Sequence, residues 1–143
     1  MPHLVILYTG QLDQEVKMTS LCRQLADAML TVKDESGKQV FPTGGTRVLA
    51  YPAPHHAVAD GGAAGIAAGG DGDYAFVYLN LRMGRGRSEA TQRLAGETLI
   101  GVTKKFFESL MATKHMGVTL QIDVGQEVFD AKHSSLHPLF NKA

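Results

Sequence analysis

The stretch that decides the fold is residues 73–99, DYAFVYLNLRMGRGRSEATQRLAGETL. Its first eleven residues alternate between two faces, which is typical of a β-strand. The GRGRS that follows is a turn, and Ser88 is a suitable N-cap with Glu89 in the first turn of a helix. Apolar residues then recur at helical spacing to about Thr113. One face of the strand holds Ala75, Val77, Leu79, Leu81 and Met83, and the other holds Tyr74, Phe76, Tyr78, Asn80 and Arg82.

The same order of elements occurs at the start of the chain. Residues 3–9 (HLVILYT) are almost continuously apolar, as in a strand covered on both faces. Helical spacing predicts a helix from Leu12 to about Val32, and residues 46–53 (TRVLAYPA) form a short strand. Residues 116–124 (MGVTLQIDV) are the last long strand, and they follow the second helix. The sequence therefore predicts strand–helix–strand twice.

Two such βαβ units account for a single domain over residues 1–143, with pseudo-repeats at about 2–58 and 73–128 and a short C-terminal tail. Right-handed connections then give an α/β (α+β) fold, a four-stranded sheet with both helices on one face. Between the units, residues 54–73 (PHHAVADGGAAGIAAGGDGD) are rich in Ala and Gly and have few side chains to anchor them. We expect this segment to be a mobile excursion.

The helix-free face of this sheet would be bare but apolar. The first strand is apolar almost throughout, and the third carries Tyr74, Phe76 and Tyr78 on its second face. An exposed apolar face of this size indicates a partner surface. We therefore expect an oligomer in which sheets pack against each other.

The composition excludes several classes of protein. The 143 residues are 44% hydrophobic and 20% charged with a formal net charge of zero, so nothing global indicates a nucleic acid or a membrane surface as partner. Cys22 is the only cysteine, which rules out an internal disulfide, and its apolar-periodic context favours a buried thiol. No apolar run approaches the roughly 18 residues of a membrane span, and no basic segment precedes the first one. We expect a cytoplasmic protein.

Pro2 is the first candidate functional residue. A proline has no N–H to donate, so it is tolerated at the start of a strand. Because an initiator methionine is normally removed before a small residue, we expect the mature chain to begin with Pro2 as a secondary amine. The reference pKa of an α-amino group is about 8, and apolar burial lowers it, so this amine can act as a general base or form an iminium with a carbonyl. An ordinary strand start explains Pro2 equally well.

Arginines provide the second set of candidates. Arg85 and Arg87 lie at the start of the second helix, where backbone N–H groups and a guanidinium fork suit a carboxylate. The alternative is a solvated turn, and the glycines lack the G-K-[ST] ending of a phosphate-binding P-loop. Arg47 leads into the second strand within FPTGGTRVLA and on its own is compatible with a surface charge. The histidine pairs His55–His56 and His133–His137 do not define a metal site, so we expect no metal and no cofactor.

Taken together, these motifs resemble the tautomerase superfamily. The stretch NLRMGRGRSEATQRLAGETL is similar to the superfamily's strand–turn–helix, and the order of Pro2, FPxxGxR, DYAFV, GxGRS and a short H…LF tail also matches. Within the superfamily the resemblance is closest to the 5-carboxymethyl-2-hydroxymuconate delta-isomerases. It covers most of the chain and is loose across the first helix.

The resemblance implies a homotrimer of double βαβ subunits, with active sites near subunit interfaces around the N-terminal proline. Pro2 would be the base that moves a proton within a small carboxylated dienol or enone such as 5-carboxymethyl-2-hydroxymuconate. Arg47 and Arg87 would hold substrate carboxylates and favour charge developing on the 2-oxygen, so that neither a metal nor a cofactor is needed.

The sequence departs from the family pattern at three places. It has a longer loop around residues 34–39, a long Ala/Gly-rich segment over 59–72, and Leu7 where an acidic residue is expected. Two alternatives therefore stay open. One is another superfamily activity, such as keto–enol tautomerisation, decarboxylation or dehalogenation of a small unsaturated acid, although no acidic residue is clearly placed to activate water. The other is a non-catalytic oligomeric binding module.

Overall fold

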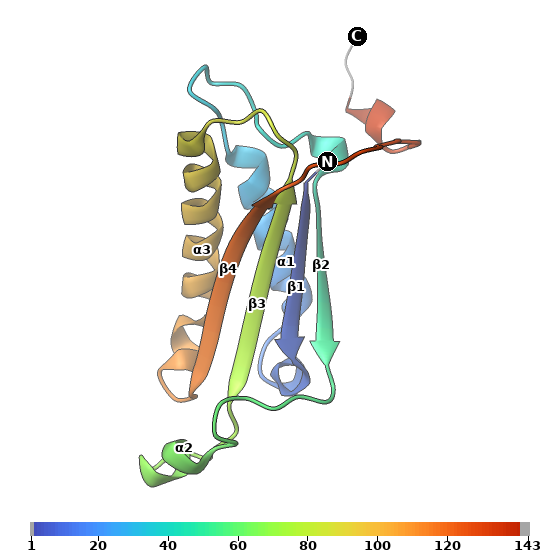
Figure 1. Cartoon of the computed structure of the whole chain (residues 1–143). Helices are drawn as coiled ribbons and strands as arrows, with labels where there is room; N and C mark the ends of the chain where they lie inside the picture. Colours follow the sequence, from blue (N-terminus) through green and yellow to red (C-terminus); the bar gives the residue numbers. More distant parts are fainter. Residues whose placement is uncertain (1, 141–143) are drawn as a thin grey trace.

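A computed structural model describes residues 2–140 of the chain. Four strands form one sheet in the order β2-β1-β3-β4. β1 is parallel to β2, β3 is parallel to β4, and β1 is antiparallel to β3, so two βαβ units lie side by side (Figure 1). This confirms the predicted four-stranded fold. The elements are β1 (His3–Thr9), α1 (Met18–Thr31), β2 (Arg47–Ala53), α2 (Ala63–Ala67), β3 (Ala75–Met83), α3 (Glu89–Met111) and β4 (Met116–Val124), with 3₁₀ turns η1 (Gly10–Gln14), η2 (Thr43–Gly45) and η3 (His137–Leu139).

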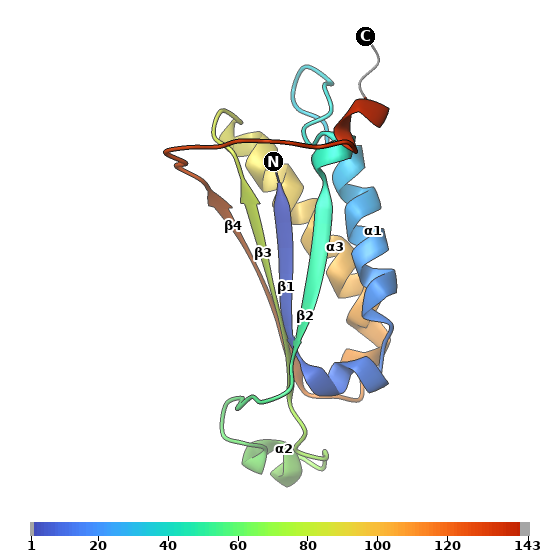
Figure 2. The same ribbon diagram turned by 90° about the vertical axis from the view of Figure 1, so that its right-hand side faces the viewer.

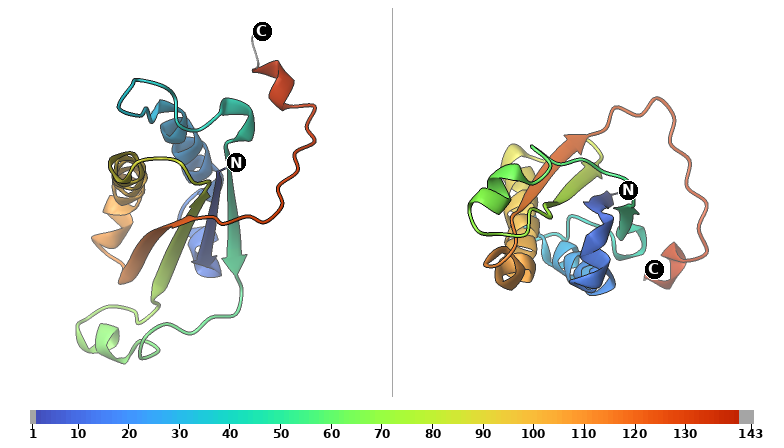
Figure 3. Two further views of the ribbon diagram at one scale, coloured as in Figure 1. Left: turned by 45° about the horizontal axis from the view of Figure 1, so that its top comes forward. Right: turned by 90° about the horizontal axis from the view of Figure 1, so that it is seen from below.

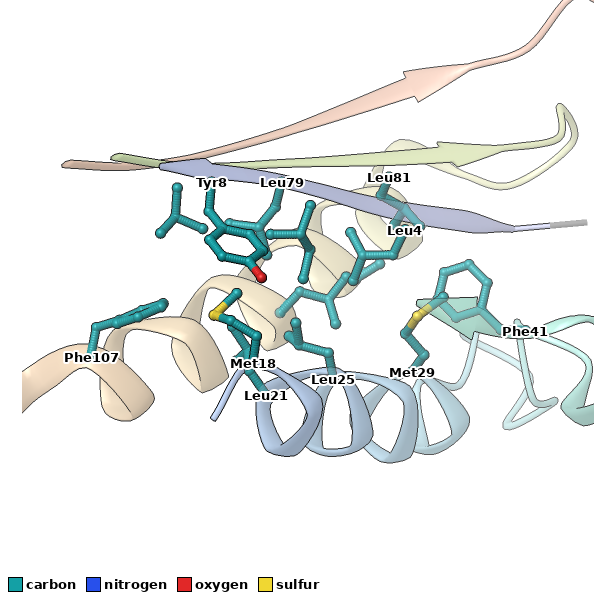
Figure 4. Close-up of a cluster of buried hydrophobic side chains, with 14 of the residues drawn as sticks. Leu4, Tyr8, Met18, Leu21, Leu25, Met29, Phe41, Leu79, Leu81 and Phe107 are labelled. Carbon is teal, nitrogen blue, oxygen red and sulfur yellow. The ribbon is translucent and has the colours of Figure 1, made fainter. Parts of the chain in front are cut away.

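Both long helices, α1 and α3, cover the same face of the sheet, and the opposite face has no helix (Figure 2). The core lies between these two layers, where β3 alternates buried residues with half-buried or exposed ones, in agreement with the two faces predicted from its sequence. α1 adds a stripe of buried residues spaced three and four apart, which is the core-facing side of an amphipathic helix (Figure 4). That stripe consists of Met18, Leu21, Leu25 and Met29.

The predicted start of the first helix, at Leu12, is wrong. A 3₁₀ turn covers Gly10–Gln14, and α1 begins only at Met18. Lys17 has extended backbone angles (φ −93°, ψ 97°), which interrupt the helical hydrogen bonds. Leu12 is nevertheless fully buried, because the 3₁₀ turn points it into the core. Its apolar spacing relative to α1 therefore reflected burial rather than a continuous helix.

The second helix begins where the sequence indicated. The Ser88 side chain accepts a hydrogen bond from the N–H of Thr91 at 3.1 Å, so Ser88 is the N-cap of α3. The cap satisfies one of the N–H groups that the first turn of a helix leaves without a partner. The turn of residues 84–88 therefore connects the end of β3 directly to a capped start of α3.

The Ala/Gly-rich segment between β2 and β3 extends past the far end of the sheet and contains the short helix α2 (Figure 1, Figure 3). Asp60 accepts hydrogen bonds from the N–H groups of Gly62 and Ala64, both at 2.9 Å. Gly62 has φ +117°, and a Cβ there would collide with the carbonyl oxygen of Gly72. The segment expected to be a mobile excursion thus has a local fold that depends on its glycines.

The C-terminal tail returns to the opposite end of the sheet. It leaves β4 at Val124, crosses the end at which β1 and β2 begin, and reaches η3 beside η2 (Figure 3). A Cβ on Gly44 in η2 would lie 2.8 Å from the Cα of His137, so this contact requires glycine. Within residues 2–140, no helix combines the length and apolar character needed to cross a membrane.

Candidate active site

All three predicted site residues lie at one end of the sheet. Pro2 directly precedes β1, Arg47 begins β2, and Arg87 lies in the turn that follows β3. Because β1 is parallel to β2 and antiparallel to β3, the starts of the first two strands and the end of the third meet at this end (Figure 1). Pro2 is buried there, while the neighbouring His3 is exposed. Met1, whose removal the sequence predicts, lies outside the described residues.

A row of basic side chains crosses the helix-free face at this end. His3 on β1 is the register partner of Arg47 on β2 and of Arg82 on β3. Arg47 Nε donates a hydrogen bond to His3 Nδ1 at 3.0 Å, and Arg47 Nη1 donates to the carbonyl oxygen of Gly45, also at 3.0 Å. Arg47 Nη2 is 2.8 Å from His3 Nε2, and only one nitrogen of a neutral imidazole can accept.

The pKa of His3 lies below the ordinary 6.5. Although much of His3 is exposed, the largest cause is partial desolvation of the ring against its neighbours, which disfavours the imidazolium. The positive charge of Arg47 comes next, and Arg82 acts in the same direction. His3 is therefore a neutral hydrogen-bonding group near pH 7, and the permanent charge of the row is on the two arginines.

The row forms one wall of an open groove with a volume of about 770 Å³. His3, Arg47 and Arg82 line it from the sheet, and Gly44 lines it from η2. The opposite wall is the C-terminal tail between residues 125 and 136. The groove thus exists only because the tail crosses this end of the sheet.

One pair of opposite charges in the tail cancels. Lys132 Nζ forms an ion pair with Asp130 Oδ2 at 2.6 Å, which leaves Glu127 as the other carboxylate of the groove. The sheet wall is therefore the positive side, and guanidinium groups there suit carboxylates. Among residues 2–140, no group of three His, Cys, Asp or Glu side chains could hold a metal ion.

Arg87 does not line this groove. Its side chain is half-buried, with Nη2 donating to the carbonyl oxygen of Val40 at 3.1 Å and Nη1 to that of Gly84 at 3.2 Å. The guanidinium also lies 6.0 Å from the centroid of the Phe41 ring. Within a single chain the structure therefore brings Arg47 and Arg87 to the same end of the sheet but not into one groove.

The loop after α1 is attached to the start of α3. Glu35 accepts a hydrogen bond from the hydroxyl of Ser88 and another from that of Thr91 at 3.3 Å. The bond from Ser88 is the main reason that the pKa of Glu35 is lowered. Together with the Arg87–Val40 bond, these contacts fix the loop beside the turn that carries Arg87.

Sequence reasoning did not select His3 or Arg82. Alternation along β3 does assign Arg82 to the helix-free face, but only the strand order places it next to His3. Leu7, in contrast, is on that face where an acidic side chain was expected and is 48% exposed. It adds apolar surface and no charge.

The topology is a tautomerase-like fold: two βαβ units share one sheet, with both long helices on one face and a proline at the start of the first strand. A solved structure of malonate semialdehyde decarboxylase shows the same fold at 16% identity, with a TM-score of 0.53 and coverage of 92% of this chain and 91% of that chain. At that identity the likeness concerns the fold alone.

Within this class, the chain belongs to the 5-carboxymethyl-2-hydroxymuconate isomerase family, whose model matches residues 2–140. A crystal structure of a 5-carboxymethyl-2-hydroxymuconate delta-isomerase is 64% identical, with a TM-score of 0.96 and coverage of 100% of this chain and 95% of that chain. One from Deinococcus radiodurans R1 is 28% identical, with a TM-score of 0.80 and coverage of 99% and 95%. The Escherichia coli Delta-isomerase is 24% identical over 140 residues, 98% of this chain and 99% of the relative. The protein is therefore an isomerase, and the non-catalytic alternative is set aside.

Proposed function

We propose that this isomerase moves a proton within an unsaturated 2-hydroxy polycarboxylate such as 5-carboxymethyl-2-hydroxymuconate, the compound in the names of its relatives. The observation that carries the proposal is the groove at the start of β1, whose sheet wall is formed by His3, Arg47 and Arg82. The two guanidinium groups of this wall suit a substrate with several carboxylates. Pro2 directly precedes His3 in the chain.

In this proposal Pro2 is the general base. With residue 1 removed, the Pro2 nitrogen is a secondary amine, and its neutral form can accept a proton. It accepts the proton of the 2-hydroxyl group, which leaves a dienolate, and then donates that proton to a distant carbon of the conjugated chain. One proton leaves oxygen and one arrives at carbon, so the reaction needs no further reactant.

Arg47 stabilises the negative charge that develops on the 2-oxygen. Its Nε–His3 bond and Nη1–Gly45 bond hold the guanidinium in place before substrate arrives, so little reorganisation is needed during the reaction. We assign Arg87 to a second substrate carboxylate. Because Arg87 lies outside the groove of its own chain, this role requires a site that is completed at a subunit interface.

We propose a homotrimer as the assembly that supplies this interface. The helix-free face exposes 48% of Leu7, 43% of Leu49 and 51% of Tyr51, which form an apolar surface suited to burial between subunits. A fold neighbour, fused 4-OT, is described as an asymmetric trimer (14% identity, TM-score 0.51). Analytical ultracentrifugation should give three times the mass of one chain. A monomer at assay concentration would contradict the trimer.

A ketonisation assay tests the reaction itself. The purified protein is mixed with 2-hydroxydienoates that carry one, two or three carboxylates, and loss of the dienol absorbance is followed while NMR identifies the product. We expect the ketone isomer as product, without loss of CO₂ or halide, and faster turnover as carboxylates are added. No turnover of any 2-hydroxydienoate would contradict the proposed function, and a decarboxylated product would favour another superfamily activity.

A further inference from the structure

We propose that Arg82 binds the substrate carboxylate farthest from the reacting 2-oxygen and thereby makes the groove selective for tricarboxylates over dicarboxylates. The inference rests on the proposed function and adds a specificity-determining residue to it. It is carried by the position of Arg82 in the sheet, by its available donors and by the charges around it.

The sheet places Arg82 at a fixed spacing from Arg47. Both are register partners of His3, on either side of β1, and all three line the same groove. Neighbouring strands are about 4.8 Å apart, so the two arginine backbones are separated by about 10 Å. The guanidinium of Arg47, held at the position of the 2-oxygen, and that of Arg82 at this spacing can therefore contact the two ends of one small elongated molecule.

The guanidinium of Arg82 has donors available for such a ligand. Within residues 2–140 it makes no hydrogen bond and no ion pair, whereas Arg47 and Arg87 both donate to groups of the protein. Asp123, the register partner of Arg82 on β4, accepts a hydrogen bond from Asn80 Nδ2 at 2.8 Å instead. A bidentate pair with a substrate carboxylate would therefore replace water rather than an internal contact.

The remaining charges of the groove still allow Arg82 to attract an anion. Asp130 is paired with Lys132, and Glu127 is the one lining carboxylate for which the described residues provide no ion pair. His3 is neutral near pH 7, so Arg82 is the cation that a third carboxylate meets, with Asp123 beside it on β4 and Glu127 on the facing wall. A substrate without this carboxylate would lose nothing when Arg82 is replaced, and that difference is the basis of selectivity.

The test compares the variants Arg82→Gln and Arg82→Lys with the parent enzyme on matched tricarboxylate and dicarboxylate 2-hydroxydienoates. For Arg82→Gln we expect kcat/KM on the tricarboxylate to fall by about ten- to a hundredfold, mostly through KM, with the dicarboxylate changed less than about twofold. Arg82→Lys should recover part of the loss because it keeps the charge but not the fork. Arg93→Gln is the control, since Arg93 is also exposed but lies on α3 and does not line the groove.

An equal fall on both substrates, or no fall on either, would overturn the assignment of Arg82. A binding measurement separates this result from failure of the proposed function. Calorimetry with propane-1,2,3-tricarboxylate and pentanedioate should show that Arg82→Gln weakens only the tricarboxylate, even if the parent enzyme turns over none of the dienoates. Equal affinities in parent and variant would contradict the inference whatever the reaction proves to be.

Discussion

Arg47 Nε and His3 Nδ1 are 3.0 Å apart, across the neighbouring strands β2 and β1. Since an arginine side chain stays protonated in proteins, the bond requires the Nδ1 atom of His3 to be an unprotonated acceptor. The contact thus couples the ionisation of His3 to the position of Arg47. It also joins the start of β2 to the residue that follows Pro2.

The first prediction concerns the pKa of His3, which should lie below 6.5. Between this lowered value and 6.5 the unfolded chain binds more protons than the folded chain, so stability should fall as the pH is lowered from 7 through that range. NMR titration of the imidazole measures the pKa directly, and Arg47→Gln should raise it. Denaturant unfolding at pH 5 and pH 7.5 should show a smaller acid loss for His3→Gln. A His3 pKa at or above 6.5 would refute the coupling.

The second prediction concerns Arg87. If its guanidinium holds a substrate carboxylate, Arg87→Ala should lower kcat/KM by about one to two decades, which corresponds to the roughly 1.5–3 kcal/mol of a charge-assisted hydrogen bond. Arg87→Lys should recover only part of this activity, because lysine lacks the bidentate fork. Steady-state kinetics on the tricarboxylate substrate measure the effect.

Arg87 also bonds the carbonyl oxygens of Val40 and Gly84, so its replacement can disturb the loop. Thermal unfolding of the same variants separates the two effects. A stable Arg87→Ala enzyme that works at the parent rate would remove Arg87 from the substrate site.

The third prediction concerns the N-cap of α3. Ser88→Ala removes the acceptor of the Thr91 N–H and the donor to Glu35, and it should cost about 1 kcal/mol of unfolding free energy. Urea denaturation measures this cost, with Ser135→Ala, an exposed change in the tail, as the matched control. Equal stability of the two variants would show that the cap is unimportant.

The fourth prediction concerns the tail that forms the outer wall of the groove. Gly44→Ala would place a Cβ 2.8 Å from the Cα of His137, so η2 and η3 must move apart. We expect faster proteolysis between residues 125 and 136 and a higher KM. Gly101→Ala is the control, because a Cβ at Gly101 in α3 would meet nothing within 4 Å. Unchanged proteolysis in Gly44→Ala would mean that the tail is held by other contacts.

The local elements were predictable because each rests on short-range signals. Two-residue alternation located β3, and Ser88 before a run of helical spacing located the start of α3. The same spacing failed at Leu12, because a 3₁₀ turn can bury a leucine in register with the helix that follows it. Periodicity reports which residues are buried, and it does not by itself report the backbone that buries them.

The site was only partly predictable, because it depends on contacts between distant parts of the chain. Pro2, Arg47 and Arg87 are recognisable from motifs, and topology brings them to one end of the sheet. No local signal shows that Arg87 bonds Val40, or that the tail crosses the sheet to enclose the row of basic side chains. Arg82 was visible only as one member of an alternating strand.

The central claim is that a free N-terminal proline is the base of this isomerase. Intact-mass and N-terminal peptide mass spectrometry of purified, active enzyme tests it most directly. We predict a chain that begins at Pro2 with an unmodified secondary amine. A catalytically active chain that retains a residue before Pro2, or carries an acyl group on its nitrogen, would contradict the claim, because an amide nitrogen cannot accept the proton.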